Sequence, residues 1–165
     1  MILTTHAIVG AAIATLIPSH PVAALAAGIA SHFAIDAIPH WDYPLQSMFR
    51  GAKERAALKL DRGLIIDFGT IAVDGFLGLG LTILLFANPA NLIAVLCGAL
   101  GGLLPDPLQF VHRLYPYGPL RILQRFHSWI HSKRKLAWPI GVASQLSFNA
   151  IVILLALELP VGRLV

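Results

Sequence analysis

Five long apolar stretches dominate the chain, and short polar segments separate them. They cover roughly 1–17, 21–38, 63–87, 90–111 and 138–158. At a rise of about 1.5 Å per residue, the last three can cross a hydrocarbon core about 30 Å thick. The first two are shorter and alanine-rich, so they either cross fully or form a shallow, re-entrant pair. The pattern predicts an all-α, polytopic membrane protein with about five hydrophobic helices.

Two further segments have the pattern of short amphipathic helices that lie at the membrane surface. In 119–132, Leu123, His127 and Ile130 fall on one face, while arginine and serine residues occupy another. The segment 46–60 likewise opposes an apolar side to a basic one. We expect both helices to contact anionic lipid headgroups. Because no linker or low-complexity run divides the chain, residues 1–165 are predicted to form a single domain.

Composition and charge placement support a membrane location and set an orientation. Hydrophobic residues make up 57% of the chain and charged residues only 12%, about half the usual share. Most Lys and Arg residues lie in 41–62 and 112–137, which are two crossings apart and so share a side. The positive-inside rule makes that side cytoplasmic and predicts a multi-pass protein of the cell (inner) membrane. Without aromatic–basic interleaving, the net charge of +4 indicates lipid contact and no nucleic-acid partner.

Histidines and aspartates gather at the predicted cytoplasmic end, where burying them is costly unless they are paired. The densest stretch is 31–42. His32 and Asp36 are four residues apart and share a helix face, and Pro39 lets His40 and Asp42 turn back toward them. We interpret these groups as ligands of a common ion. The alternative is a hydrogen-bonded His–Asp pair that closes a buried helix end.

Three further residues belong to the predicted site. Asp74 lies roughly 15 Å along an apolar helix, where a carboxylate needs a cation, a proton or a metal, so we expect it to be the most essential residue. Asp106 stands between two prolines that fix its direction, although Asp is also common in helix-terminating turns. His127 lies on the apolar face of 119–132. The predicted metal ligands are His6, His32, Asp36, His40, Asp42, Asp74, Asp106 and His127.

This ligand set predicts one or two divalent metal ions, with zinc favoured and manganese or iron as alternatives. The chain has no phosphate-binding loop, dinucleotide fingerprint or nucleophile elbow. We therefore expect hydrolysis of an ester or phosphoester, with a lipid as candidate substrate, by metal-activated water, and Asp74 and His127 as catalytic residues. A transporter is disfavoured because the far half of most helices is apolar. A further alternative is a non-catalytic membrane protein whose metal is structural.

Three short motifs carry a resemblance to a known family. They are Thr5–Gly10, Gly102–Asp106 and Phe126–Ser128. With them the chain resembles the small integral-membrane metal-dependent hydrolases, typified by the LexA-regulated bacterial inner-membrane hydrolase. That family has an N-terminal His, a Pro-Asp-x-Asp-His element and a Thr-His-Ser element. The resemblance implies a zinc-dependent hydrolase, related to zinc-dependent phospholipases.

The chain also departs from the family pattern. Asp106 is not followed by the second Asp and adjacent His, although His112 lies nearby in sequence, and Phe126 replaces the family's Thr. The element 31–42 resembles a second, richer version of the ligand pattern, in which 39–42 takes the Pro-Asp-x-Asp-His role.

Overall fold

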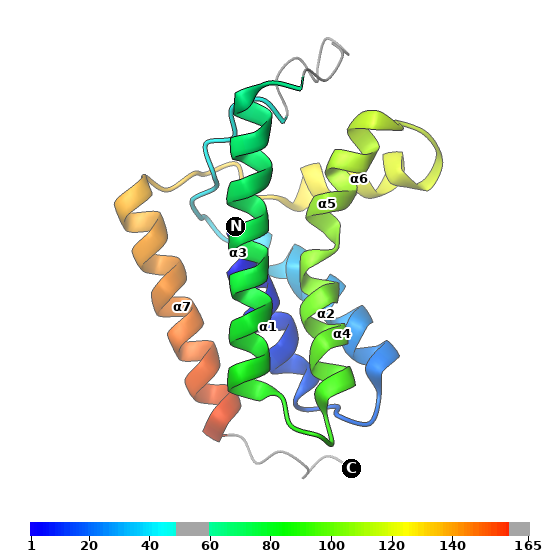
Figure 1. Ribbon diagram of the computed structural model, residues 1–165, viewed down its shortest axis with the longest axis vertical. Coiled ribbons are helices and arrows are strands. Elements are labelled where there is room, and N and C mark those ends of the chain that lie inside the picture. Colours follow the sequence, from blue (N-terminus) through cyan, green and yellow to red (C-terminus); the bar gives the residue numbers. More distant parts are fainter. Residues whose placement is uncertain (49–59, 159–165) are drawn as a thin grey trace.

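The computed structural model describes residues 1–48 and 60–158, and over these ranges it contains seven helices and no strand. The predicted all-α class is confirmed. Figure 1 shows α2, α3, α4 and α7 around α1, with α5 and α6 toward one end of the bundle. In chain order they are α1 (Leu3–Ala14), α2 (Pro21–Asp36), α3 (Arg62–Phe86), α4 (Leu92–Leu103), α5 (Pro105–Leu114), α6 (Gly118–Ile130) and α7 (Trp138–Glu158).

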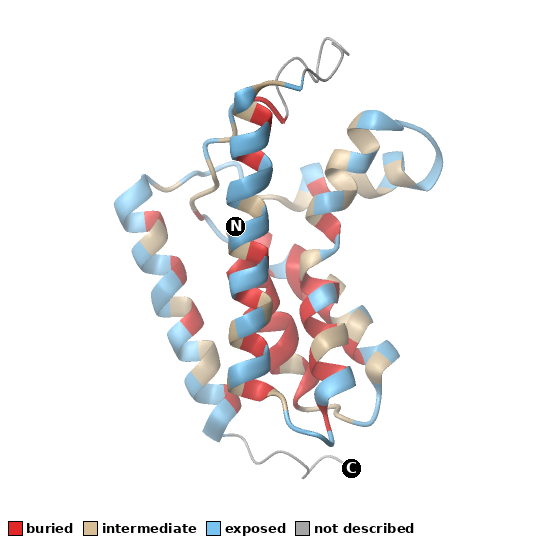
Figure 2. Cartoon of the chain, viewed as in Figure 1, coloured by how far each residue is buried: buried red, intermediate tan, exposed pale blue. Residues whose placement is uncertain are grey.

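Helix α1 forms the core of the bundle. It packs against α2, α3, α4 and α7, and Ile13 is the single residue of the helix that is not buried. Figure 2 shows burial concentrated on α1 and on the helix faces turned toward it. A helix that is apolar on all sides lies either in a protein core or in lipid, and the packing of four neighbouring helices around α1 makes it a core helix. The first apolar stretch therefore places its residues, His6 among them, in the protein interior.

Close contact between α1 and α4 depends on glycines. A Cβ added to Gly98 would lie 2.3 Å from the carbonyl oxygen of Gly10, and one added to Gly102 would lie 2.3 Å from that of His6. Both contacts involve backbone, which cannot move aside like a flexible side chain. Small residues at such positions allow helices to approach closely in membrane proteins. Gly102 thus sets how near His6 comes to α4.

Fewer helices are long enough to span a membrane than the five predicted. Helices α3 and α7 qualify by length and apolar composition, and α4 with α5 would make a third span bent by 46°. Helices α1 and α2 have 12 and 16 residues. At about 1.5 Å per residue they reach about 18 Å and 24 Å, short of a hydrocarbon core about 30 Å thick. The described residues thus have two or three candidate spans.

The fourth apolar stretch, 90–111, forms two helices in the structure. Helix α4 ends at Leu103 and α5 begins at Pro105. Proline is favoured in the first helical turn, where its missing N–H has no partner to lose, and it restricts the residue before it. Asp106 consequently lies in the first turn of α5, where the helix dipole favours a carboxylate, and does not end α4.

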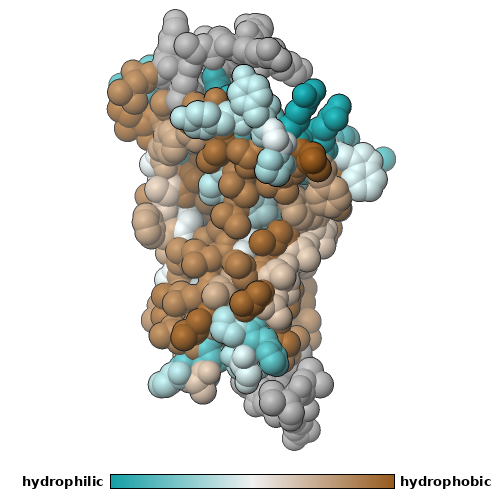
Figure 3. Space-filling view, turned by 90° about the vertical axis from the view of Figure 1, so that its right-hand side faces the viewer, coloured by the Kyte–Doolittle hydropathy of each residue, from teal (hydrophilic) through white to brown (hydrophobic). Residues whose placement is uncertain are grey.

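The outer faces of α3 and α7 are apolar. Val73, Phe76 and Leu84 on α3, and Ile140 and Leu154 on α7, are each more than 60% exposed. Figure 3 shows an apolar band between polar side chains at the two ends of the molecule. Exposed apolar surface of this extent is unusual for a soluble monomer and is expected where lipid covers it. The structure is therefore consistent with a membrane protein.

The two predicted surface helices have different outcomes. Helix α6 covers most of 119–132, and it buries His127 while exposing Arg121 and Arg125. The other segment, 46–60, lies mostly outside the described residues.

Candidate metal site

Asp36 lies at the centre of a group of histidines. It is the last residue of α2, and its side chain is only 1% exposed. The Nε2 atoms of five imidazoles face its two carboxylate oxygens: those of His127, His6, His32, His131 and His40, at 3.0, 3.3, 3.4, 3.7 and 3.8 Å. We call these six residues, with Asp42 and Asp106, the His/Asp cluster.

Separate parts of the chain bring the cluster together. His6 comes from α1, His32 from α2, Asp106 from α5 and His127 from α6. His40 follows α2, where the helix ends before Pro39. The segment after α6 is tied to this region by backbone hydrogen bonds from Ser132 to the Asp36 carbonyl and from Leu136 to the His40 carbonyl. These bonds place His131 over the end of α2.

Backbone carbonyls orient two of the imidazoles. His32 Nδ1 donates to the Gly102 carbonyl at 2.7 Å, and His40 Nδ1 donates to the Ile38 carbonyl at 2.6 Å. A proton held on Nδ1 leaves the Nε2 lone pair free, and this is the arrangement that metal-binding histidines adopt. Within the described residues, the buried Nε2 atoms of His6, His32 and His40 have no partner of hydrogen-bond geometry. Such orphaned, converging lone pairs fit a metal ion.

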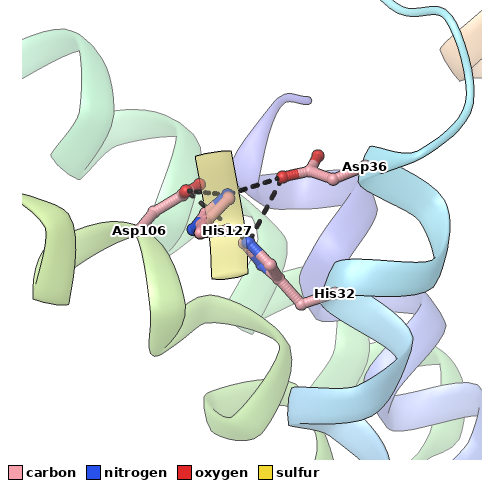
Figure 4. A group of neighbouring side chains, drawn as sticks. All are labelled: His32, Asp36, Asp106 and His127. Atoms are coloured by element: carbon pink, nitrogen blue, oxygen red, sulfur yellow. Dashed lines mark hydrogen bonds and ion pairs between the residues drawn. The ribbon is translucent and has the colours of Figure 1, made fainter. Parts of the chain in front are cut away.

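One group of four residues brings its donor atoms within 4.8 Å of one another: His32, Asp36, Asp106 and His127. Figure 4 shows them pointing toward one another from α2, α5 and α6. His32 Nε2 lies 3.6 Å from Asp106 Oδ1, and His127 Nε2 lies 3.9 Å from the same oxygen. Donors bound tetrahedrally to one zinc ion would lie about 3.4 Å apart, given bonds of about 2.1 Å. The group could therefore hold a metal ion.

A second group shares Asp36 and adds His40 and His131. Asp42 borders it, with Oδ1 2.8 Å from His40 Nε2 and Oδ2 3.8 Å from His131 Nε2. Asp42 also accepts a hydrogen bond from Lys135. Burial alone would raise the pKa of the Asp42 carboxyl, but the close His40 imidazole and the positive charge of the Met1 amine hold that pKa below its ordinary range. Asp42 therefore carries a negative charge beside this group.

The carboxylates already attract a cationic group. The amine of Met1 contacts Asp36 Oδ1 at 3.1 Å and Asp42 Oδ1 at 2.8 Å. His6 lies just outside both groups, and its ring stacks on that of His32 with centroids 3.9 Å apart. All of the predicted ligands except Asp74 thus lie in the His/Asp cluster.

Asp74 lies apart and binds the beginning of α1. Its carboxylate accepts hydrogen bonds from Thr4 N at 3.1 Å, from Thr4 Oγ1 at 2.6 Å and from the Tyr43 hydroxyl. The first N–H groups of a helix have no partner inside the helix, so an acceptor from a neighbouring helix satisfies them. Burial, together with the Asp74 carboxylate, raises the pKa of the Tyr43 hydroxyl above its ordinary value and keeps it a donor. This network explains how α3 tolerates a carboxylate.

Several other polar residues have structural partners. Asp67 of α3 accepts three backbone hydrogen bonds, from Gln46, Ser47 and Met48, at 2.7–2.8 Å. On α7, Gln145 accepts a hydrogen bond from Ile2 N at 2.9 Å, and Asn149 donates one to Thr5 Oγ1 at 3.1 Å. The polar residues of α7 therefore hold the first turn of α1.

His131 was not among the predicted ligands, yet its Nε2 lies 3.7 Å from Asp36 Oδ2. It lies four residues after His127, so one helix face would carry both imidazoles, and this spacing was the available signal. Of the remaining histidines, His20 precedes α2 at the opposite end from the cluster, and His112 is a half-buried residue of α5 that contacts none of the cluster's carboxylates at ion-pair distance.

Comparison with family models, with curated proteins and with solved structures finds no match for this chain. The functional argument therefore rests on the His/Asp cluster and its surroundings.

Proposed function

We propose that this protein is a membrane-embedded, metal-dependent hydrolase that cleaves an ester or phosphoester at the cytoplasmic headgroup level. The observation that carries the proposal is the set of buried imidazole Nε2 atoms without hydrogen-bond partners, directed at Asp36. Uncompensated buried polar atoms cost free energy, and a bound cation would remove that cost. The mixture of imidazole and carboxylate donors favours zinc, with manganese or iron as alternatives.

The chemistry assigns distinct tasks to the residues. A divalent cation bound there would polarise the scissile group and acidify a water molecule. The ligands of this cation would be His32, Asp36, Asp106 and His127. The second group could hold a second cation. The oxygen of water bonds to phosphorus or to the carbonyl carbon, the ester bond breaks, and the proton from water passes to the departing alcohol.

His127 is suited to both of its predicted roles. Its Nε2 faces Asp36, while its buried Nδ1 has no hydrogen-bond partner among the described residues. It also lines a polar pocket of about 350 Å³ with Ser128, His131 and Lys133. Water and a leaving group could reach the cluster through this pocket. Asp74 is assigned to stabilising α1, since its oxygens are taken by Thr4 and Tyr43.

Charge supports the cytoplasmic orientation of this end. Lys133, Arg134 and Lys135 lie shortly after the end of α6 and are exposed. Lys and Arg are enriched on the cytoplasmic side of membranes, and they attract anionic headgroups there. A soluble or a lipid-borne ester could both reach a site at this depth.

The test is hydrolysis by the purified protein in lipid nanodiscs with 4-nitrophenyl phosphate and 4-nitrophenyl acetate. We expect metal-dependent cleavage of at least one substrate, abolished in His32→Ala and retained in His20→Ala, whose imidazole lies far from the cluster. Absence of cleavage by a zinc-, manganese- or iron-loaded sample would overturn the proposal.

A further inference from the structure

An apolar cavity of about 570 Å³ lies next to the His/Asp cluster. Its walls come from α1, α3, α5 and the segment before the undescribed residues, and they include Leu3, Phe68, Ile71, Phe110 and Val111. The rings of Phe68 and Phe110 meet edge to face, with centroids 5.1 Å apart, so α3 and α5 join across this region. The volume falls within the range of about 300–1,000 Å³ that is usual for ligand sites.

One end of the cavity is polar and belongs to the cluster. Asp42, Asp106 and His131 line it, together with Lys135. His131 and Lys135 also line the polar pocket on the other side, and so does Gln109. The candidate metal site therefore lies between the apolar cavity and the polar pocket, which is lined by Lys133 and Lys135.

The cavity also continues into the surface that lipid is expected to cover. Phe68 and Val111 are 43% and 37% exposed, so its walls are partly outer surface of α3 and α5. A bilayer lipid could move a chain sideways into such a space without passing through water. A small soluble phosphoester would fill only the polar side and would leave the apolar walls uncovered.

We infer that the cavity binds the acyl or alkyl chain of a phosphate-bearing lipid, with the phosphate at the cluster. The inference rests on the proposed function and names its substrate class. An anionic headgroup suits Lys133 and Lys135 on the polar side. Asp42 and Asp106 would repel the phosphate unless cations intervene, so the same cations would serve binding and cleavage.

Photo-crosslinking locates the chain independently of catalysis. The probe is dodecyl phosphate with a diazirine at the chain end, added to the protein in phosphatidylcholine nanodiscs. We expect labels on Ile71 and Phe110, competed by unlabelled dodecyl phosphate and not by inorganic phosphate. Leu154, exposed on α7, reports general contact with lipid. Equal labelling of α7, without competition, would overturn the inference.

A cavity-filling variant gives the second readout. Ile71→Trp should lower dodecyl phosphate labelling and hydrolysis about tenfold, because overpacking excludes the chain. Ile71→Trp should retain its metal content and its hydrolysis of 4-nitrophenyl phosphate. Leu154→Trp should hydrolyse both substrates at the parent rate. If Ile71→Trp fails to fold, Val111→Trp replaces it.

The two proposals fail differently. If a folded, metal-loaded cavity variant hydrolyses dodecyl phosphate and 4-nitrophenyl phosphate more slowly by the same factor, only the lipid-chain inference is contradicted. Unchanged hydrolysis of dodecyl phosphate in that variant would also contradict only the lipid-chain inference. A protein that is labelled in the cavity but cleaves neither phosphate nor 4-nitrophenyl acetate would contradict the proposed function and retain the lipid site.

Discussion

Replacing Gly102 by alanine tests how α4 positions the candidate metal site. The new Cβ would lie 2.3 Å from the His6 carbonyl oxygen and 2.9 Å from its carbonyl carbon. Restoring an ordinary contact of about 3.4 Å requires α1 and α4 to separate by about 1 Å, because neither backbone atom can rotate away. The Gly102 carbonyl also accepts the His32 Nδ1 proton, so His32 would lose its alignment.

Two effects of known size follow from that displacement. Overpacking costs about 1–3 kcal/mol of folding free energy. Disturbing a group that orients a metal-bound histidine lowers metal affinity about 10–100-fold. We therefore expect Gly102→Ala to unfold at a lower temperature and to lose zinc at a lower chelator concentration than the parent.

A glycine without neighbours provides the matched control. A Cβ at Gly80, in the C-terminal half of α3, would have no atom within 4 Å. Gly80→Ala should retain stability or raise it by up to about 1 kcal/mol through helix propensity. The assay is thermal unfolding in nanodiscs, with and without zinc, combined with a chelator competition. Equal zinc affinity and equal unfolding temperature for Gly102→Ala and Gly80→Ala would refute the reasoning.

Three other predictions follow from the site and its surroundings. Asp74→Ala should destabilise the fold by about 1–3 kcal/mol, since Thr4 and Tyr43 lose their acceptor, while zinc content stays at the parent level; loss of zinc with full stability would contradict this. The raised pKa of Tyr43 keeps its hydroxyl protonated in alkali, so Tyr43→Phe should leave the tyrosinate absorbance change between about pH 9 and 11 unchanged, and a smaller change would refute the Tyr43–Asp74 network. His131→Ala should reduce bound zinc from two ions to one, because His131 belongs only to the second group, and unchanged stoichiometry would argue for a single ion.

Local spacing in the sequence was enough to place His32 and Asp36 on one face. An interval of four residues brings two side chains together on any helix, and Pro39 ends this one close by. The apolar and basic faces of 119–132 similarly predicted α6 and the inward direction of His127. These features depend on helix geometry alone, so they can be predicted from a single sequence.

Features that depend on packing between helices were harder to predict from the sequence. Hydropathy measures the apolar character of a stretch and not what covers it, so buried α1 resembles a membrane span. Asp74 was expected in the site because a carboxylate in an apolar helix needs a partner. Its partners in the structure, Thr4 and Tyr43, are distant in sequence and of common types, so the sequence did not reveal them. The break at Pro105 carried a local signal, a proline within an apolar run, and it moved Asp106 to a new helix.

Metal content tests the central claim most directly. The protein is purified without added chelator and analysed for zinc, manganese and iron, beside Asp36→Asn and His20→Ala. We predict at least one bound divalent ion per chain in the parent and in His20→Ala, and none in Asp36→Asn, because both groups of ligands share Asp36. Equal metal content in all three, or none in a parent supplied with zinc, would contradict the account.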